Sequence, residues 1–119
     1  MIRAVLVRRG ARPHARHAAA PIVLLSARKN RRLLLRLARE LEREGWTTRR
    51  LSDAGWPRLR VFCPGAPVLG ETVWLAYQGG RWWYRSSANL WLAPIEDPVR
   101  AAAGIVQVLG PRLVESRLR

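Results

Sequence analysis

The spacing of hydrophobic residues changes twice along the chain, and this change limits the fold to a mixed α+β class. After residue 29 the spacing is helical, because four residues recur at i, i+3, i+4 and i+7: Leu34, Leu37, Ala38 and Leu41. Asn30 is a residue type that caps helix N-termini, and Gly45 followed by Trp46 is typical of a helix that ends in a left-handed glycine. We therefore predict a helix from residue 30 to about residue 45.

Strand-like segments follow this helix. They alternate with period two or are rich in Thr, Val and aromatic residues, and they lie at residues 46–51, 58–63, 72–77, 81–85 and 89–93. The segment 64–67, Pro-Gly-Ala-Pro, predicts a loop that interrupts the series. Because sequential hairpins between two terminal helices pack most simply in two layers, we expect an α+β fold. Its antiparallel sheet would have three to five strands, with an N-terminal and a C-terminal helix packed on one face.

The hairpin with the clearest signal surrounds Gly79-Gly80. A two-residue turn there pairs positions whose numbers sum to 159. This register opposes Tyr77 to Trp82 and Leu75 to Tyr84 on one face of the sheet. On the other face it opposes Ala76 to Trp83 and Trp74 to Arg85. Both faces are aromatic, so each needs either a covering layer or a ligand.

The last helix is predicted to begin at Asp97-Pro98 and to end near Leu109, before Gly110-Pro111. Its buried face would consist of Ala102, Ile105, Val106 and Leu109. Its outer face carries little charge, and we expect it to consist of Arg100, Ala103, Gly104 and Gln107. Such a surface would suit packing against a second copy of the chain, so a homodimer through this helix is one possibility.

Positive charge is concentrated at the start of the chain. Residues 1–39 contain eleven Arg or Lys and no acid, whereas residues 40–119 contain eleven Arg or Lys and eight acids. We interpret residues 1–29 as a basic flexible arm, with a short strand possible at residues 2–7, and residues 30–119 as one domain. A translation start placed too far upstream would produce the same arm. Cys63 is the only cysteine, and the longest apolar run is too short to span a membrane, so we expect a cytoplasmic protein.

The residue types that catalysis and metal binding require are scarce. His14 and His17 are the only histidines, and both lie in the predicted arm. The acidic residues are explained by helix pairs and helix capping, as with Glu40 four residues after Arg36. No phosphate-binding loop, nucleophile elbow or dinucleotide fingerprint occurs. We expect no enzymatic activity, no cofactor and no metal site.

Four arginines form a stripe on the outer side of the first predicted helix. They fall within an arc of about 60° opposite the leucine face, and they are Arg32, Arg36, Arg39 and Arg43. Clustered cations release counterions when they meet a phosphate backbone, so the stripe is a candidate contact for nucleic acid or an acidic partner. The alternative is an ordinary solvated helix surface.

Trp74, Trp83 and Arg85 would share one face of the hairpin. Aromatic residues on a sheet can stack with unpaired bases, and they are also common at protein interfaces. The alternative is that they belong to the core, or pack beneath residues 64–69 or the predicted N-terminal strand.

Three segments carry a resemblance: residues 70–75 (Gly-Glu-Thr-Val-Trp-Leu), residues 81–84 (Arg-Trp-Trp-Tyr) and residues 92–98 (Leu-Ala-Pro-Ile-Glu-Asp-Pro). Over residues 33–109 the chain resembles small uncharacterised actinobacterial proteins that are often encoded beside helix-turn-helix regulators. The resemblance implies an accessory or regulatory binding role and no chemistry. We therefore expect a non-catalytic module that binds a protein partner, plausibly a DNA-binding regulator. The alternative is nucleic-acid binding by the arm and the arginine stripe.

Overall fold

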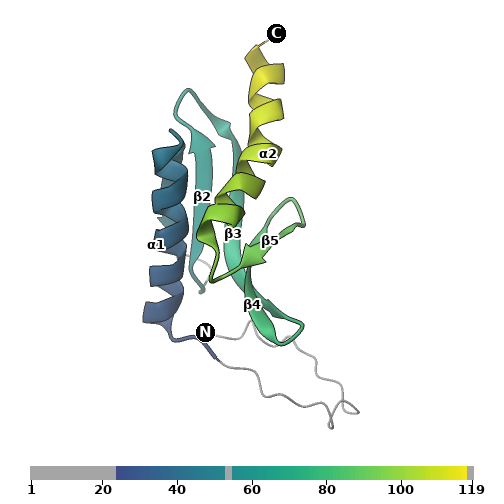
Figure 1. Ribbon diagram of the computed structural model, residues 1–119. Helices are drawn as coiled ribbons and strands as arrows, with labels where there is room; N and C mark the ends of the chain where they lie inside the picture. The colour runs from purple at the N-terminus through teal and green to yellow at the C-terminus, as the bar shows by residue number, and fades with distance from the viewer. Residues whose placement is uncertain (1–23, 53–54, 118–119) are drawn as a thin grey trace.

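The expected α+β fold is confirmed by the computed structural model, which describes residues 24–52 and 55–117. Its elements, in chain order, are α1 (Ala27–Arg43), β1 (Thr47–Leu51), β2 (Arg58–Cys63), β3 (Ala66–Gln78), β4 (Arg81–Ser86), β5 (Trp91–Pro94) and α2 (Pro98–Arg117). The strands form one antiparallel sheet in the order β1-β2-β3-β4-β5, and Figure 1 shows both helices on one side of it. The predicted strand at residues 2–7 lies outside the described residues.

Helix α1 begins earlier than its sequence pattern suggests. Ser26, in an extended conformation, is the N-cap, and its side-chain oxygen accepts a hydrogen bond from the Lys29 backbone N–H at 3.0 Å. The predicted cap, Asn30, therefore lies inside the helix, because a serine four residues upstream already satisfies a free N–H of the first turn. The predicted C-terminal end is confirmed. Gly45 has φ +92°, and the Trp46 N–H donates to the Leu41 carbonyl at 3.1 Å.

The β3–β4 hairpin has the predicted register. Tyr77 pairs with Trp82, Leu75 with Tyr84, and Trp74 with Arg85. Gly79 and Gly80 both have positive φ, as a two-residue turn with the favoured twist requires. The observed register is thus the one that a two-residue Gly-Gly turn predicts.

Strand β3 is longer than predicted, and the predicted loop at residues 64–67 is wrong. Only Pro64 and Gly65 form the turn, since Ala66 already pairs with Cys63, and a register shift follows between Phe62 and Cys63. Proline is tolerated at such irregular strand positions. Farther along β3, a Cβ on Gly70 would lie 2.6 Å from the Val61 carbonyl oxygen, so the absence of a side chain lets β2 approach closely.

Helix α2 does not end before Gly110-Pro111, as its sequence predicts, but continues to Arg117. Proline inside a helix loses a backbone hydrogen bond, so other contacts must hold the last turns in place. One such contact is a salt bridge of 2.9 Å between Arg112 and Glu71 of β3, a carboxylate with 5% side-chain exposure. Gly104 is not on the outer face either, since a Cβ there would lie 3.0 Å from the Leu92 side chain.

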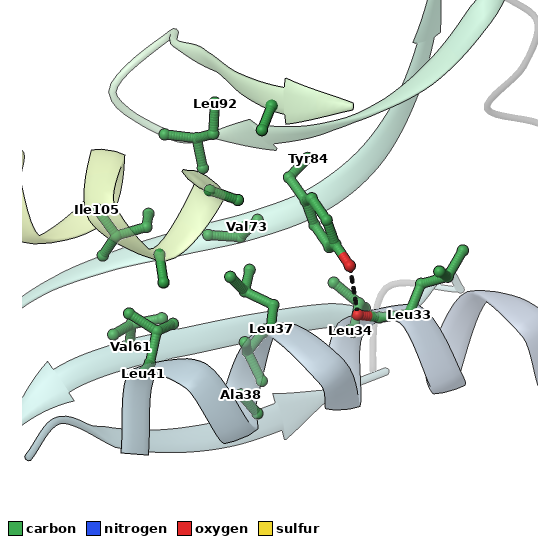
Figure 2. Packing of buried hydrophobic residues seen from close by; sticks show 14 of the residues in the cluster. Leu33, Leu34, Leu37, Ala38, Leu41, Val61, Val73, Tyr84, Leu92 and Ile105 are labelled. Carbon is green, nitrogen blue, oxygen red and sulfur yellow. Dashed lines mark hydrogen bonds between the residues drawn. The ribbon is translucent and has the colours of Figure 1, made fainter. Parts of the chain in front are cut away.

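The core lies between the helices and one face of the sheet. It consists of Leu33, Leu34, Leu37, Ala38, Leu41, Leu59, Val61, Val73, Leu75, Tyr84, Leu92, Ala93, Ala101, Ala102, Ile105 and Leu109. Figure 2 shows Tyr84 directed from the sheet toward α1, where its hydroxyl donates to the Leu33 carbonyl at 2.7 Å. Burial of each large aliphatic side chain contributes about 1.5–3 kcal/mol. This one-sided core leaves the opposite face of the sheet without a described layer over it.

Candidate binding surface on the open face of the sheet

We define the open face as the side of the sheet that neither described helix covers. Helix α1 packs against β1 and β2, and α2 packs mainly against β5 and β3 (Figure 1). Because side chains alternate along a strand, residues next to the buried core positions project to the other side. The main side chains of the open face are Arg49 of β1, Arg58, Arg60 and Phe62 of β2, Thr72 and Trp74 of β3, Arg81, Trp83 and Arg85 of β4, and Trp91 of β5.

Strand pairing arranges these side chains in two rows. In the first row, Arg60 of β2 pairs with Arg49 on one side and Thr72 on the other. In the second row, Arg85 of β4 lies between Trp74 and Trp91. The rows are neighbours, because Thr72 and Trp74 are two residues apart on the same face of β3. The open face therefore crosses all five strands, with adjacent arginines on β1 and β2 and an arginine between two tryptophans on β3, β4 and β5.

The charge on this face has one sign. Five arginines project from it, and the only acidic residue within the five strands is Glu71. Glu71 is buried on the helix side, where it bonds to Ser87 and Arg112. At the margin, Glu96 approaches Arg81 at 3.8 Å, but both side chains are more than half exposed, so water screens this pair. The face is strongly cationic as a result.

Arginines and aromatic rings contact each other directly on the open face. The Arg85 guanidinium lies 4.1 Å from the centroid of the Trp91 ring, and the Arg81 guanidinium lies 5.6 Å from that of Trp83. At the other end of the face, Arg49 lies 5.9 Å from the Phe62 ring. Such cation–π contacts contribute about 0.5–1 kcal/mol each at exposed sites. They place these guanidinium groups beside the aromatic rings of the open face.

Other contacts also orient these side chains. The Trp83 indole N–H donates to the Gln78 carbonyl at 3.0 Å, and the ring meets Trp91 edge-on at a centroid distance of 6.1 Å. Arg85 donates to the side chain of Asn89, which has a positive φ in the turn before β5. Side chains held in this way lose less conformational entropy when they bind a ligand.

The structure brings together the three residues of the predicted aromatic surface. Trp74, Trp83 and Arg85 share the open face, are half-buried, and are not part of the buried core. Neither the segment at residues 64–69 nor either helix packs over them as a layer, because residues 66–69 belong to β3 itself. Trp74 and Trp83 are not in the buried core cluster of the described residues, and the alternative that they pack beneath the predicted N-terminal strand falls on residues outside the described part of the chain.

The arginine stripe occupies a different surface. Arg32, Arg36, Arg39 and Arg43 are all exposed on α1, on the side away from its buried leucines. Arg43 pairs with Glu40 at 2.8 Å. Because α1 lies on the helix side of the sheet, the stripe and the open face are on opposite sides of the domain (Figure 1). One small partner cannot contact both surfaces at once.

Sequence reasoning missed several residues of the open face, chiefly Arg49, Arg60, Phe62 and Trp91. The signal was present in part, since Arg58-Leu59-Arg60-Val61-Phe62 alternates with period two. The alternation does not reveal the register in which β2 pairs with β3. This register shifts between Phe62 and Cys63. The pairing of that strand with the hairpin decides whether these arginines lie beside the tryptophans.

Other chemistry is sparse in the described part of the chain. Within residues 24–52 and 55–117, no three His, Cys, Asp or Glu side chains are grouped as metal ligands. A largely apolar cavity of about 310 Å³ lies at the start of α1, lined among others by Asn30, Trp56 and Trp82. Neither described helix has an apolar stretch long enough to cross a membrane.

Comparison with known protein families, curated proteins and solved structures found no match to this chain. The resemblance of residues 33–109 to small actinobacterial proteins stays a prediction. A function must therefore be inferred from the residues of the chain itself.

Proposed function

We propose that this protein is a non-catalytic binding module that takes up single-stranded nucleic acid on the open face of its sheet. The observation that carries the proposal is the composition of that face, which combines five arginines with Phe62, Trp74, Trp83 and Trp91 and to which no strand contributes an acid. Proteins that bind single strands combine a cationic surface for the phosphates with aromatic side chains on which bases stack.

Each residue type has a distinct role in this proposal. Arg49 and Arg60, adjacent across β1 and β2, contact phosphates and release counterions. Trp74 and Trp91 flank Arg85 and supply stacking surfaces for bases, while the guanidinium plane of Arg85 offers a further surface for stacking. Double-stranded DNA presents its bases edge-on within grooves, so a broad sheet face is less suited to it than to an unpaired strand.

The test is a fluorescence-anisotropy titration of labelled single-stranded RNA, single-stranded DNA and duplex DNA. We compare the wild-type protein with Trp74→Ala and Arg85→Ala, and with Arg39→Ala as a matched control. Arg39 is exposed on α1, on the opposite side of the domain, so this control removes the same charge from a surface outside the site. Loss of one stacked base costs about 1–3 kcal/mol, which corresponds to a roughly 5- to 150-fold weaker affinity.

The expected result is tighter binding of single strands than of duplex, weakened by the two open-face variants and not by Arg39→Ala. If Arg39→Ala weakens binding as much as Arg85→Ala, the contact is a diffuse charge effect and the open face is not the site. If no nucleic acid binds at physiological salt, the proposal is wrong.

A second candidate function is the binding of an acidic protein partner, such as a DNA-binding regulator. The observation that favours it is that Arg81 and Arg85 already lie over the rings of Trp83 and Trp91, which leaves less ring surface for bases. Trp and Arg are also the residue types that contribute most to protein interfaces. Affinity capture from lysate with Trp83→Ala and Arg36→Glu tests this candidate. A partner that both variants retain would rule out these surfaces.

Self-association through α2 is a separate proposal. Arg100, Ala103 and Gln107 are exposed on this helix, and Val99 is 61% exposed. Size exclusion with light scattering measures the mass directly. A monomer at every concentration would remove α2 as a dimer interface.

A further inference from the structure

Two contacts fix the side chain of Arg85 on the open face. Its guanidinium lies 4.1 Å from the centroid of the Trp91 ring, and it donates a hydrogen bond to the side-chain oxygen of Asn89. Arg85 is half-buried, and it forms no ion pair with an acid among the residues that the structure describes. Its charge is therefore held by an aromatic ring and a neutral amide, neither of which neutralises it.

The turn that carries Asn89 is itself well defined. Asn89 has φ +69°, a left-handed conformation that asparagine adopts more readily than most residues. Its N–H donates to the Ser86 carbonyl at 2.9 Å, and the Ser86 N–H donates to the Leu90 carbonyl at 3.0 Å. Ser86 is fully buried, so the turn is anchored to the core. Asn89 is thus placed to position the Arg85 side chain.

The hydrogen bond to Asn89 occupies only part of the guanidinium of Arg85. It involves Nη2, which carries two hydrogens. One of these belongs to the pair of parallel donors that Nη2 forms with Nη1, and the other belongs to the pair that Nη2 forms with Nε. Whichever hydrogen Asn89 accepts, one complete pair of donors is left. Arginine uses such a pair to bind two acceptors side by side, a geometry that lysine does not reproduce.

Trp74 lies beside Arg85 on the face, because the two residues are directly opposed across β3 and β4. Within the described part of the chain, no arginine and no other aromatic ring contacts the Trp74 ring. The rings of Trp83 and Trp91 differ in this respect, since arginines lie over both. Directly opposed side chains have Cβ atoms about 4.5–5.5 Å apart. A base stacked on Trp74 would therefore have one edge within reach of Arg85.

We propose that Arg85 binds the edge of a guanine base that stacks on Trp74, so that the open face prefers single strands containing guanine. Guanine carries two acceptors, O6 and N7, on one edge, and a pair of arginine donors matches them. This edge is accessible in an unpaired base. The inference rests on the proposed function of the open face, and it adds a base specificity that phosphate contacts alone do not supply.

The experiment changes single groups of the base. Labelled oligouridine strands of one length carry guanine, hypoxanthine, 7-deazaguanine, adenine or cytosine at one central position. Hypoxanthine keeps both O6 and N7 and lacks only the exocyclic amine of guanine. 7-Deazaguanine keeps the stacking surface and lacks the N7 acceptor. Adenine replaces the O6 acceptor with an amino group that donates, and cytosine offers a different pair of acceptors, N3 and O2.

Fluorescence anisotropy at physiological salt measures the affinity of the wild-type protein for each strand. We expect guanine and hypoxanthine to bind at least about fivefold more tightly than the other three bases, the low end of what one pair of arginine donors contributes. Equal affinity for guanine and 7-deazaguanine overturns the proposal, because stacking alone would then explain the binding. A preference for cytosine overturns it as well, since Arg85 would then contact other acceptors.

Two variants separate the donor geometry from the charge. Arg85→Lys keeps the cation and loses the paired donors. Asn89→Gly retains a residue suited to positive φ and loses the amide that positions Arg85. Both should abolish the preference for guanine over 7-deazaguanine and change the affinity for the adenine strand little. Arg39→Lys is the matched control, because Arg39 is exposed on α1 on the opposite side of the domain, and it should keep both the affinity and the preference.

The outcomes distinguish this inference from the proposed function. If single strands bind and Arg85→Lys weakens all five strands equally, Arg85 contacts a phosphate, so the base specificity is wrong and the proposed function stands. If Arg85→Lys keeps the guanine preference, another residue binds the base edge and the inference also fails. If no single strand binds to the wild-type protein, the proposed function and the inference fail together.

Discussion

Substitution of Tyr84 with Phe removes one hydroxyl group and tests whether water is excluded from the contact between α1 and the sheet. Tyr84 is fully buried, and its hydroxyl donates to the Leu33 carbonyl at 2.7 Å. In Tyr84→Phe this hydrogen bond is lost. The Leu33 carbonyl keeps its helical hydrogen bond from the Leu37 N–H, so no buried polar group is left without a partner. The expected loss is therefore that of one ordinary hydrogen bond, about 1 kcal/mol. In a domain of this size it lowers Tm by about 4–8 °C.

The same substitution changes how stability depends on pH. Burial raises the pKa of Tyr84 above its ordinary value, although the nearby positive charge of Arg36 opposes this effect. Above about pH 10 the unfolded chain loses the tyrosine proton while the folded protein keeps it. The free energy of unfolding of the wild type therefore falls as pH rises beyond 10, by up to about 1.4 kcal/mol per unit from this group. Tyr84→Phe has no ionisable group at this position, so its free energy of unfolding and that of the wild type converge as pH rises beyond 10.

Urea denaturation at pH 7 and at several values between pH 9 and 11 measures both effects. Tyr77→Phe is the matched control, because the Tyr77 hydroxyl bonds to no described residue, and it should change stability by less than about 0.5 kcal/mol. If Tyr84→Phe equals the wild type at pH 7 and remains parallel to it at high pH, the hydroxyl is not held in a water-excluded contact.

Three further predictions concern the sheet and the proposed binding of single strands. Arg112→Ala leaves the Glu71 carboxylate buried without its cation, and should cost about 1–3 kcal/mol in urea denaturation, with Arg112→Lys recovering part of the loss. Gly70→Ala places a methyl group 2.6 Å from the Val61 carbonyl oxygen, and should cost about 1–3 kcal/mol in thermal denaturation. Affinity for single strands should fall with salt at a log–log slope of about −0.7 per phosphate contacted, or about −3.5 if all five open-face arginines take part. A slope near zero in an anisotropy titration would contradict the role given to these arginines.

The features that the sequence determined alone are those that neighbouring residues control. The leucine spacing of α1, the left-handed end at Gly45 and the Gly79-Gly80 hairpin depend on interactions within a few residues. The shared face of Trp74, Trp83 and Arg85 follows from the same hairpin, because the register of a tight turn decides which side chains are neighbours. This part of the candidate site could be predicted for that reason.

Local signals failed where distant contacts compete with them. Gly110-Pro111 is an ordinary signal for the end of a helix, yet α2 continues because Arg112 meets Glu71, forty-one residues away in the chain. Pro64 to Pro67 is an ordinary signal for a loop, yet β2 holds β3 in register from Ala66 onward. In each case a tertiary contact outweighs the local conformational preference that the sequence pattern indicates.

The tertiary structure alone decided which surface is the candidate site. From the sequence, the arginine stripe of α1 and the aromatic hairpin could have formed one surface, but the packing of α1 on the far side of the sheet separates them. Pairing of β1 and β2 with the hairpin instead brings Arg49 and Arg60 to the tryptophan face. Charge and periodicity are local properties of a sequence, whereas the neighbours of a side chain across a sheet depend on which strands pair and in which register.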